Sequence, residues 1–389
     1  RMSALTALSI DILRASAAFD ENHVFSPLAL GCALVTAHDG AAGDTKVELT
    51  RLLGKDLPAD RVSAFYASLT AGLTASSDKK EKNPLAVLTR LLANMNLKER
   101  EAESAVTATI FTHLFVDIPY TKCAIKTEYA KHVEEQYGAE IESIDFGQGV
   151  KAARDVNGLV EKHTRGRITK VVDEGAFSES GLVLASVVHF KGSWEWPFKV
   201  KNTRARPFHG VSGERIAEFM SDDDFYTRYF VSPELTVVSI GYEDKAYSMA
   251  VLMPSGDFGQ WRAGLTAGSL ETVLNNQKDG KVELWLPKWA VEATTEAKTV
   301  LNKCGVNRIF SRKDADLSVM SEADLPLCVA NIVHKAVIEV DERGTEAAAA
   351  AIADFIVLCP PFDVLVFDRP FLYLIMKGST VLFMGQHVL

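Results

Sequence analysis

Catalytic chemistry in this chain would have to come from its nine histidines, five cysteines and many acidic residues, and none of these stands in a catalytic motif. There is no G-x-S-x-G nucleophile elbow, no H-E-x-x-H zinc motif, no phosphate-binding loop ending in Lys-Ser or Lys-Thr, and no G-x-G-x-x-G. His334 leads an apolar stretch, where a lone histidine is more often a hydrogen-bonded core residue than a ligand. We therefore expect a protein that is not an enzyme, with an unsignalled catalytic cluster as the alternative.

The cysteines indicate reduced thiols and no metal centre. They are odd in number, widely spaced, and form no CxxC pair of the kind that binds zinc. The five are Cys32, Cys123, Cys304, Cys328 and Cys359. No Asn-x-Ser/Thr sequon occurs, which fits a chain that does not meet the glycosylation machinery. We expect no cofactor and no metal, and a cytoplasmic protein or one released without a cleaved signal peptide.

Charge and hydropathy exclude several kinds of partner. The 389 residues carry a net charge of −9, with a pI near 5.6, whereas a nucleic-acid-binding domain is usually basic. The longest apolar run near the start, residues 24–37, is shorter than the roughly 20 residues that a membrane helix needs. Apolar residues at helical spacing between Leu5 and Leu13 predict a first core helix, with a cleaved leader as the alternative. We expect a monomer that binds neither nucleic acid nor membrane.

The elements that must position any site fall into a helical part and a strand-rich part. The first 170 residues are mainly helical in pattern, and from about Gly181 the apolar period shifts toward two, as in residues 282–286. Residues 371–384 predict a closing hairpin, and a helix opened by two threonines should cover residues 294–305. No internal repeat or linker divides the sequence. We expect a mixed α+β fold in a single domain over residues 1–389.

Residues 341–361, DERGTEAAAAAIADFIVLCPP, form the unusual stretch of the chain. Five consecutive alanines favour helix, but a helix of this length is marginal alone, and Gly344 and two prolines bound it. An exposed alanine-rich connector or short helix is one interpretation. Taken as a strand, every second residue from Thr345 to Phe355 is small or apolar, and the charged residues fall on the other face. The segment is therefore patterned like a strand that can be buried on one face.

This stretch resembles the inhibitory hinge of the reactive-centre loop in the serpin family of serine protease inhibitors. The matching residues are Glu342, Gly344, Thr345, Glu346, Ala347, Ala348, Ala349, Ala350 and Ala351, and the loop would span about 342–366. Further matches cover nearly the whole chain: residues 24–28 (VFSPL), 190–194 (FKGSW), 286–288 (LPK), 331–340 (NIVHKAVIEV), 367–371 (FDRPF) and 383–385 (FMG). The chain is most similar to inhibitory, intracellular members, those of the ovalbumin-like clade.

The resemblance implies both a fold and a function. The fold would be a single serpin domain with a central five-stranded sheet, three sheets in all, eight or nine helices, and an exposed reactive-centre loop. A target serine protease would cut the loop, and the freed hinge would insert into the central sheet while the protease is still a covalent acyl-enzyme. The protein would then be a suicide substrate. A non-inhibitory serpin, acting as a chaperone, carrier or storage protein, is the alternative, although such members usually carry bulky or charged hinge residues.

The same alignment implies that the cleaved bond joins Leu358 to Cys359. Counting from the other end of the loop shifts the position by one and makes Cys359 the specificity residue. An apolar Leu358 suits the hydrophobic primary pocket of chymotrypsin-like, cathepsin G-like or elastase-like proteases and excludes trypsin-like ones. Papain-like cysteine proteases, which read the preceding Val357, are a second possibility.

The resemblance also implies a polar cluster, the shutter, beneath the opening sheet. It would contain Ser26, Ser186 and His334. Serpins commonly carry Asn at the position of Ser186 and Ser at that of Ala29, so this chain departs from the family pattern there. Ser26 and His334 could still hydrogen-bond across the strands.

A second implied cluster, the breach, lies at the top of the sheet. It would contain Trp194 and Lys288, with Lys288 paired to Glu342. If exposed, such an ion pair contributes about 0 to 1 kcal/mol.

Overall fold

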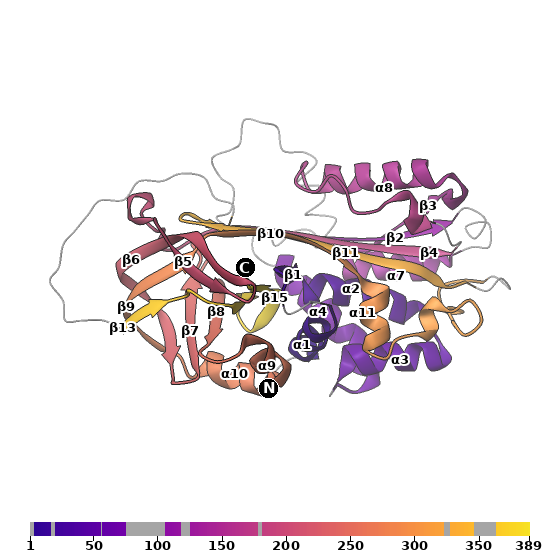
Figure 1. Cartoon of the computed structure of the whole chain (residues 1–389). Helices are drawn as coiled ribbons and strands as arrows, with labels where there is room; N and C mark the ends of the chain where they lie inside the picture. Colours follow the sequence, from indigo (N-terminus) through magenta and orange to yellow (C-terminus); the bar gives the residue numbers. More distant parts are fainter. Residues whose placement is uncertain are drawn as a thin grey trace.

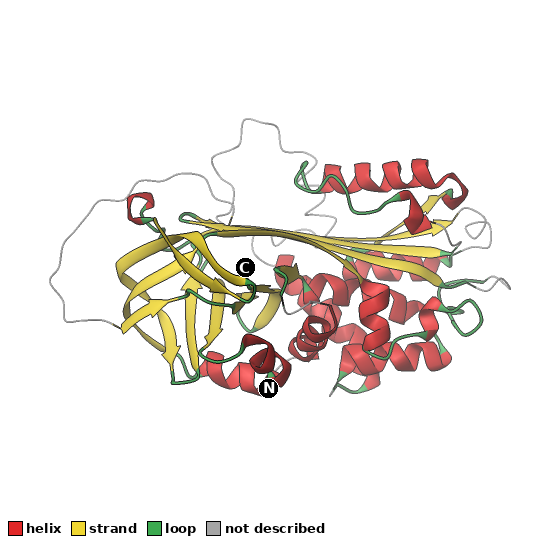
Figure 2. Ribbon diagram, in the orientation of Figure 1, coloured by secondary structure: helices red, strands yellow, loops and turns green. Residues whose placement is uncertain are grey.

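The computed structural model describes residues 4–16, 20–55, 57–74, 106–117, 125–177, 181–322, 327–345 and 363–389. Glu346 to Ala351, Leu358 and Cys359 lie outside the described residues. The described residues form nine α-helices and two hydrogen-bonded sheets, so the expected α+β class is confirmed (Figure 2). No helix within these ranges is both long and apolar enough to cross a membrane.

A six-stranded sheet crosses the molecule (Figure 1). Its strands, in spatial order, are β10 (Trp289–Glu296), β11 (Val329–Asp341), β12 (Gly344–Thr345), β4 (Leu182–Ser193), β2 (Val106–Asp117) and β3 (Glu140–Ile144). β12 has only two residues. Over the rest of their length β11 and β4 pair directly in parallel, from Val329 with Leu182 to Val337 with His189. The sheet is therefore closed along most of its length and split by a short third strand at one end.

Both faces of this sheet are covered, which explains the nearly continuous apolar run in β4. On one face, α8 (Gly149–His163) packs Val156 and Val160 against Val183 and Ala185 (Figure 1). On the other face lies α2 (Pro27–Gly40), whose residues are nearly all buried in the main core. A helix that is apolar on all sides is expected in such a position.

The second sheet has nine strands, where the resemblance implies two separate smaller sheets. The spatial order is β1 (His23–Phe25), β15 (Thr380–His387), β14 (Phe371–Lys377), β8 (Tyr247–Pro254), β7 (Leu235–Gly241), β6 (Gly213–Val231), β9 (Lys278–Pro287) and β13 (Asp363–Val366), with β5 (Arg204–Gly210) paired to β6. The 19-residue β6 pairs with β5 in its first half and with β7 in its second. A bulge between Asp222 and Phe225 bends β6, so one continuous strand joins the two parts by hydrogen bonds.

Several local predictions can be compared with these elements. The first helix is confirmed as α1 (Ala4–Ser16), and the closing hairpin is confirmed as β14 and β15. The helix predicted over residues 294–305 is shorter in the structure, where α11 covers Ala297–Lys303. Thr294 and Thr295 belong to β10 instead. The two threonines pair with β11, and that pairing outweighs their tendency to cap a helix.

Most of the remaining helices lie on the same side of the six-stranded sheet as α2, and α9 and α10 lie beside the nine-stranded sheet (Figure 1). The α-helices are α3 (Gly43–Gly54), α4 (Val62–Thr74), α7 (Thr127–Tyr137), α9 (Phe258–Gly264) and α10 (Ala267–Asn275). Short 3-10 helices are η1 (Ala59–Arg61), η2 (Phe146–Gln148), η3 (Glu174–Phe177), η4 (Val200–Asn202) and η5 (Arg308–Phe310).

Candidate functional site

The first two strand-forming residues of the hinge are already part of the central sheet. Gly344 and Thr345 form β12, which pairs antiparallel with Asp341 and Val340 of β11 and with Ser193 and Gly192 of β4. The Thr345 side chain is fully buried, and its hydroxyl lies 2.9 Å from the Tyr242 hydroxyl. The chain thus leaves β11, reverses direction and enters the gap between β11 and β4.

Gly344 is required at this reversal for two independent reasons. Its φ of +152° is a backbone conformation that side-chain-bearing residues rarely adopt. A Cβ on Gly344 would also lie 2.1 Å from the carbonyl oxygen of Gly192, which no side chain can tolerate. The close approach of the two backbones therefore depends on glycine.

Trp194 holds the reversal from the β4 side. Its backbone N–H donates to the Arg343 carbonyl at 2.9 Å, and its indole Nε1–H donates to the Asp341 carbonyl at 2.9 Å. The indole stacks on Tyr242, with ring centroids 4.7 Å apart. Trp194 and Tyr242 are both fully buried, so this aromatic pair fixes the end of β4 against the start of the hinge.

Glu342 is anchored by three groups from other elements. Lys288 Nζ lies 3.3 Å from Glu342 Oε2, Thr203 Oγ1 donates to Oε1 at 2.7 Å, and the Phe198 N–H donates to the Glu342 carbonyl at 2.7 Å. Burial alone would raise the pKa of Glu342, but the hydrogen bonds from Thr203, the backbone and Lys288 outweigh burial and hold it below its usual range. The Glu342 side chain is only 7% exposed. The contribution of about 0 to 1 kcal/mol that an exposed ion pair makes to stability therefore does not apply to the Lys288–Glu342 pair.

Farther down the sheet, Ser26, Ser186 and His334 meet as a second polar cluster. His334 and Ser186 are register partners on β11 and β4. The Ser26 N–H donates to His334 Nε2 at 2.9 Å, so His334 Nδ1 carries the proton and donates to Ser186 Oγ at 3.2 Å. Ser26 Oγ accepts from the Ala29 N–H at the start of α2. The cluster ties β4, β11 and α2 together although the family's usual Asn and second Ser are replaced.

The environment keeps His334 neutral. It is fully buried, and burial, followed by the nearby His23, lowers its pKa to about 3 against a weaker raising effect of Ser186. A neutral imidazole satisfies one acceptor and one donor here without a buried charge.

Sequence reasoning missed two residues of the site, Tyr242 and Thr203. Tyr242 follows β7 in a tight connection to β8, and Thr203 follows η4. Both reach the hinge from more than 100 positions away in the chain. No local pattern marks them, because their role depends only on where the two sheets meet.

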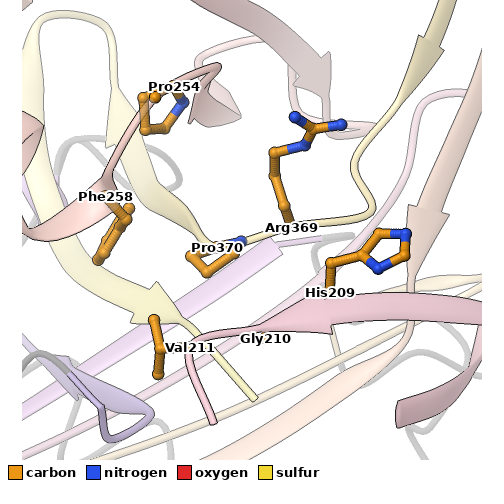
Figure 3. A pocket seen from close by; sticks show the side chains of 8 residues that line it. His209, Gly210, Val211, Pro254, Phe258, Arg369 and Pro370 are labelled. Atoms are coloured by element: carbon orange, nitrogen blue, oxygen red, sulfur yellow. The ribbon is translucent and has the colours of Figure 1, made fainter. Parts of the chain in front are cut away.

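An open cavity of about 410 Å³ lies away from the hinge, beside the residue 367–371 stretch (Figure 3). Its lining includes His209, Val211, Phe258, Arg369 and Pro370. Arg369 Nε donates to Asp368 at 3.1 Å, and His209 Nδ1 lies 3.3 Å from Glu214. The cavity contains none of the hinge, breach or shutter residues.

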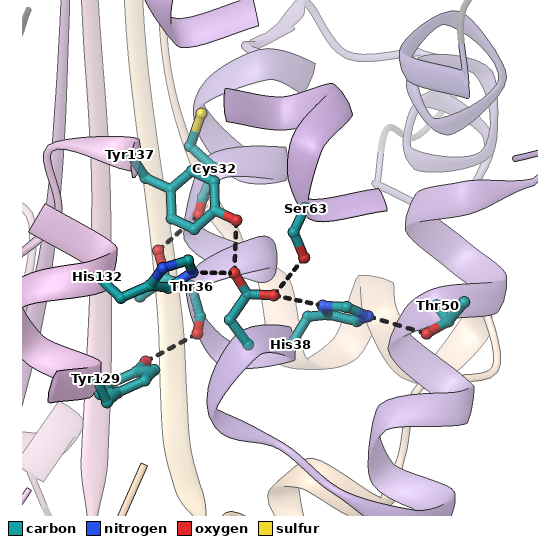
Figure 4. A network of polar contacts seen from close by, with 9 residues as sticks. Cys32, Thr36, His38, Thr50, Ser63, Tyr129, His132 and Tyr137 are labelled. Carbon is teal, nitrogen blue, oxygen red and sulfur yellow. Dashed lines mark hydrogen bonds and ion pairs between the residues drawn. The ribbon is translucent and has the colours of Figure 1, made fainter. Parts of the chain in front are cut away.

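A polar network centred on Asp39 and His38 joins α2, α3, α4 and α7 (Figure 4). The Asp39 carboxylate accepts hydrogen bonds from His38 Nδ1 at 2.9 Å and His132 Nε2 at 2.9 Å. It also accepts from Ser63 Oγ at 2.5 Å and the Tyr137 hydroxyl at 2.6 Å. Burial would raise the pKa of Asp39, but these hydrogen bonds outweigh burial and hold it well below its usual range. The carboxylate therefore fastens α2, α4 and α7 together.

The same network contains a hydroxyl–imidazole–carboxylate chain, the arrangement of a hydrolase relay. His38 Nε2 lies 3.0 Å from Thr50 Oγ1, and its Nδ1 donates to Asp39. His38 is only 1% exposed, so its imidazole is closed to a substrate. Within the described ranges, no three His, Cys, Asp or Glu side chains are placed to hold a metal ion.

Comparisons with known proteins identify the family. The chain matches the family model described as Serpin (serine protease inhibitor) over residues 3–389. It is 30% identical to the uncharacterized serpin-like protein TK1782 of Thermococcus kodakarensis, over 99% of this chain and 84% of that protein. It is 31% identical to neuroserpin of Mus musculus, over 94% of this chain and 86% of that protein.

Solved structures share the fold. Human thyroxine-binding globulin in complex with thyroxine aligns with a TM-score of 0.82 at 24% identity, over 100% of this chain and 97% of that chain. The thermophilic serpin Tengpin in its native state aligns with a TM-score of 0.79 at 22% identity, over 99% and 93%. The chain belongs to the serpin family, whose members are in general protease inhibitors and not enzymes.

Buried histidines should make the protein sensitive to acid. Burial is the main cause that lowers the pKa of His334 to about 3 and those of His23, His113 and His387 to about 4. Below pH 6.5 the unfolded chain binds protons that the folded chain does not. The free energy of unfolding should therefore decrease as the pH is lowered, by up to about 1.4 kcal/mol per pH unit for each histidine.

Urea unfolding between pH 7 and pH 5 tests this expectation. His334→Gln should reduce the slope of stability against pH by about one proton. Equal slopes for His334→Gln and the parent protein would contradict the assignment.

Asp39→Asn should lower the free energy of unfolding by about 2 to 4 kcal/mol, because an amide cannot accept all four hydrogen bonds and loses their charge assistance. Asp44→Asn is the matched control, since Asp44 is an exposed partner of Arg308 at 3.0 Å and contributes little. Chemical denaturation of both variants measures the difference, and equal losses would show that the Asp39 network is not a structural tie.

Proposed function

We propose that the protein is a suicide-substrate inhibitor of a chymotrypsin-like, cathepsin G-like or elastase-like serine protease, which it traps by inserting its hinge into the central sheet. The observation that supports this most strongly is β12. Its two residues already occupy the position of a strand between β11 and β4, which otherwise pair with each other. Insertion extends a strand that has already begun.

The register of β12 indicates where the following residues would go. Continued downward, Ala347 would come opposite Phe190 and Ile338, which belong to the main core. Glu346 would come opposite Lys191 and Glu339 on the outer face. The alternation of small and charged hinge residues therefore matches the inner and outer faces of the gap.

Insertion of the hinge replaces one ladder of hydrogen bonds, between β11 and β4, with two ladders. The parallel pairing of β11 with β4 must open from Val337 and His189 downward, and each strand then pairs antiparallel with the inserted hinge. Alanine side chains need the least separation of the layers above and below, and a charge on the inner face would be buried at a cost of several kcal/mol. The hinge composition thus favours an inhibitor over a carrier, chaperone or storage protein, the alternative function.

The shutter cluster would control how far insertion proceeds before the loop is cut. In the same register Ala351 arrives between His334 and Ser186, whose 3.2 Å hydrogen bond joins the two strands directly. That bond must break before the hinge can pass. We place the barrier that keeps the uncut form from inserting fully at this level of the sheet.

The specificity proposal depends on the loop residues themselves. Leu358 would enter the primary pocket of the protease, with Cys359 after the cut bond. Cys359 as the specificity residue, and a papain-like protease reading Val357, remain outcomes of the test below. The proposed site of action is the cytoplasm, for which the free cysteines Cys32 and Cys304 give support, and the proposed state is a monomer.

The direct assay is incubation with a panel of purified chymotrypsin-like, elastase-like and papain-like proteases, read on a denaturing gel and by residual activity. A chymotrypsin-like or elastase-like enzyme should form a covalent complex and lose activity stoichiometrically. Leu358→Arg should move the complex to trypsin-like enzymes, because their primary pocket is acidic. If every enzyme cuts the loop and stays active, the inhibitory function is wrong.

Thr345→Arg should convert the inhibitor into a substrate, because it places a charge at the first inner-face position, now fully buried beside Tyr242. Val364→Arg is the matched control, since Val364 is 56% exposed on β13 beyond the loop. The ratio of cleaved product to covalent complex should rise at least tenfold for Thr345→Arg and stay unchanged for the control. Equal ratios would mean that the hinge does not need this position.

A further inference from the structure

A second cavity, of about 470 Å³, is lined by residues of the nine-stranded sheet and by the two residues that follow Trp194 in the chain. One wall is the Glu195–Trp196 segment, which continues the chain of β4 past Trp194. A second wall is β6, through Tyr226 and Arg228, and the turn between β7 and β8 contributes Lys245. Its volume is in the range of small-molecule sites.

Two large aromatic side chains are exposed at this cavity. Trp196 is 55% exposed and Tyr226 is 56% exposed, although both belong to types that are usually more buried. Both line the cavity. An aromatic ring bound against them would cover apolar surface that the fold leaves in water.

Charged residues of both signs line the cavity. Lys245 Nζ lies 3.3 Å from Glu195 Oε1 on one wall. Arg228 and Asp279 are register partners across β6 and β9, and both line the cavity. A ligand with one sign of charge would be attracted by some of these residues and repelled by others, whereas each charge of a zwitterion can lie near residues of the opposite sign.

The cavity walls are the immediate neighbours of the hinge contacts. The Glu195 N–H donates to the Gly241 carbonyl at 2.9 Å. Their sequence neighbours Trp194 and Tyr242 stack on each other, and the Tyr242 hydroxyl lies 2.9 Å from that of Thr345. On the second wall, Phe225 stacks on Phe198 with centroids 4.9 Å apart, and the Phe198 N–H donates to Glu342. A molecule in the cavity would therefore contact residues that are adjacent to, or packed against, those that bind the hinge.

We propose that this cavity binds an aromatic zwitterion, a free aromatic amino acid or an aromatic residue of a short peptide, and that binding favours the form whose hinge is not further inserted. The site itself stands on the cavity, whereas the coupling rests on the proposed function. Hinge insertion separates β4 from β11, and the Glu195–Trp196 wall continues β4. A ligand that spans this wall and β6 binds best while the two keep their present separation.

Binding is tested by calorimetric titration of the intact protein with L-tryptophan and with Gly-Trp-Gly, which separates the free amino acid from the peptide. Trp196→Ala should weaken binding at least tenfold, and Val231→Ala, an exposed change on β6 outside the cavity, should leave it unchanged. Arg228→Gln should weaken indole-3-propionate at least fivefold but not tryptamine. No binding of either probe, or equal binding by Trp196→Ala and Val231→Ala, overturns the site.

Coupling is tested by comparing intact and loop-cleaved protein. L-tryptophan should bind the intact form at least threefold more tightly than the cleaved form, because ligand binding and hinge insertion are linked equilibria. Equal affinity for the two forms overturns the coupling. If no protease is inhibited at all, the proposed function fails while the titration still decides the site.

Discussion

The direct pairing of β11 with β4 is the contact on which the rest of the structure depends. Two strands buried on both faces must satisfy their backbone N–H and C=O groups inside the sheet. At the top they do so through β12, and below Val337 and His189 they do so through each other. The same backbone groups can therefore be satisfied with or without a strand between them. That equivalence allows insertion to proceed residue by residue without a stage at which many buried groups lack partners.

The breach and shutter clusters determine where insertion of the hinge begins and where it is held back. At the top, Glu342 is fixed by Lys288 and Thr203, and Trp194 binds the carbonyls on either side of it. These contacts hold the reversal of the chain in place, and Gly344 makes the close approach possible. Lower down, His334 links Ser186 and Ser26, so the strands are joined by side chains as well as by their ladder. A neutral buried imidazole suits such a junction because breaking and remaking its bonds exposes no charge.

The sequence predicted much of this arrangement because several signals are local. Helical spacing located α1, alternation located β9, and the family motifs brought together Lys288 with Glu342 and Ser26 with His334. The missed features are non-local. Thr294 and Thr295 look like helix caps until β11 pairs with them, and the bulge in β6 that merges two sheets has no local signature. The burial of Glu342 and the contact of Tyr242 with Thr345 arise only where the two sheets meet.

The central claim is that the sheet lacks most of one strand and that the hinge supplies it once the loop is cut. Each inserted residue adds ladder hydrogen bonds worth about 1 kcal/mol net, so the completed sheet should be far more stable than the intact form. Thermal unfolding of intact protein and of protein cut once within residues 346–362 measures this directly. The account predicts a large rise in the unfolding temperature on cleavage. An unchanged or lower unfolding temperature would contradict it.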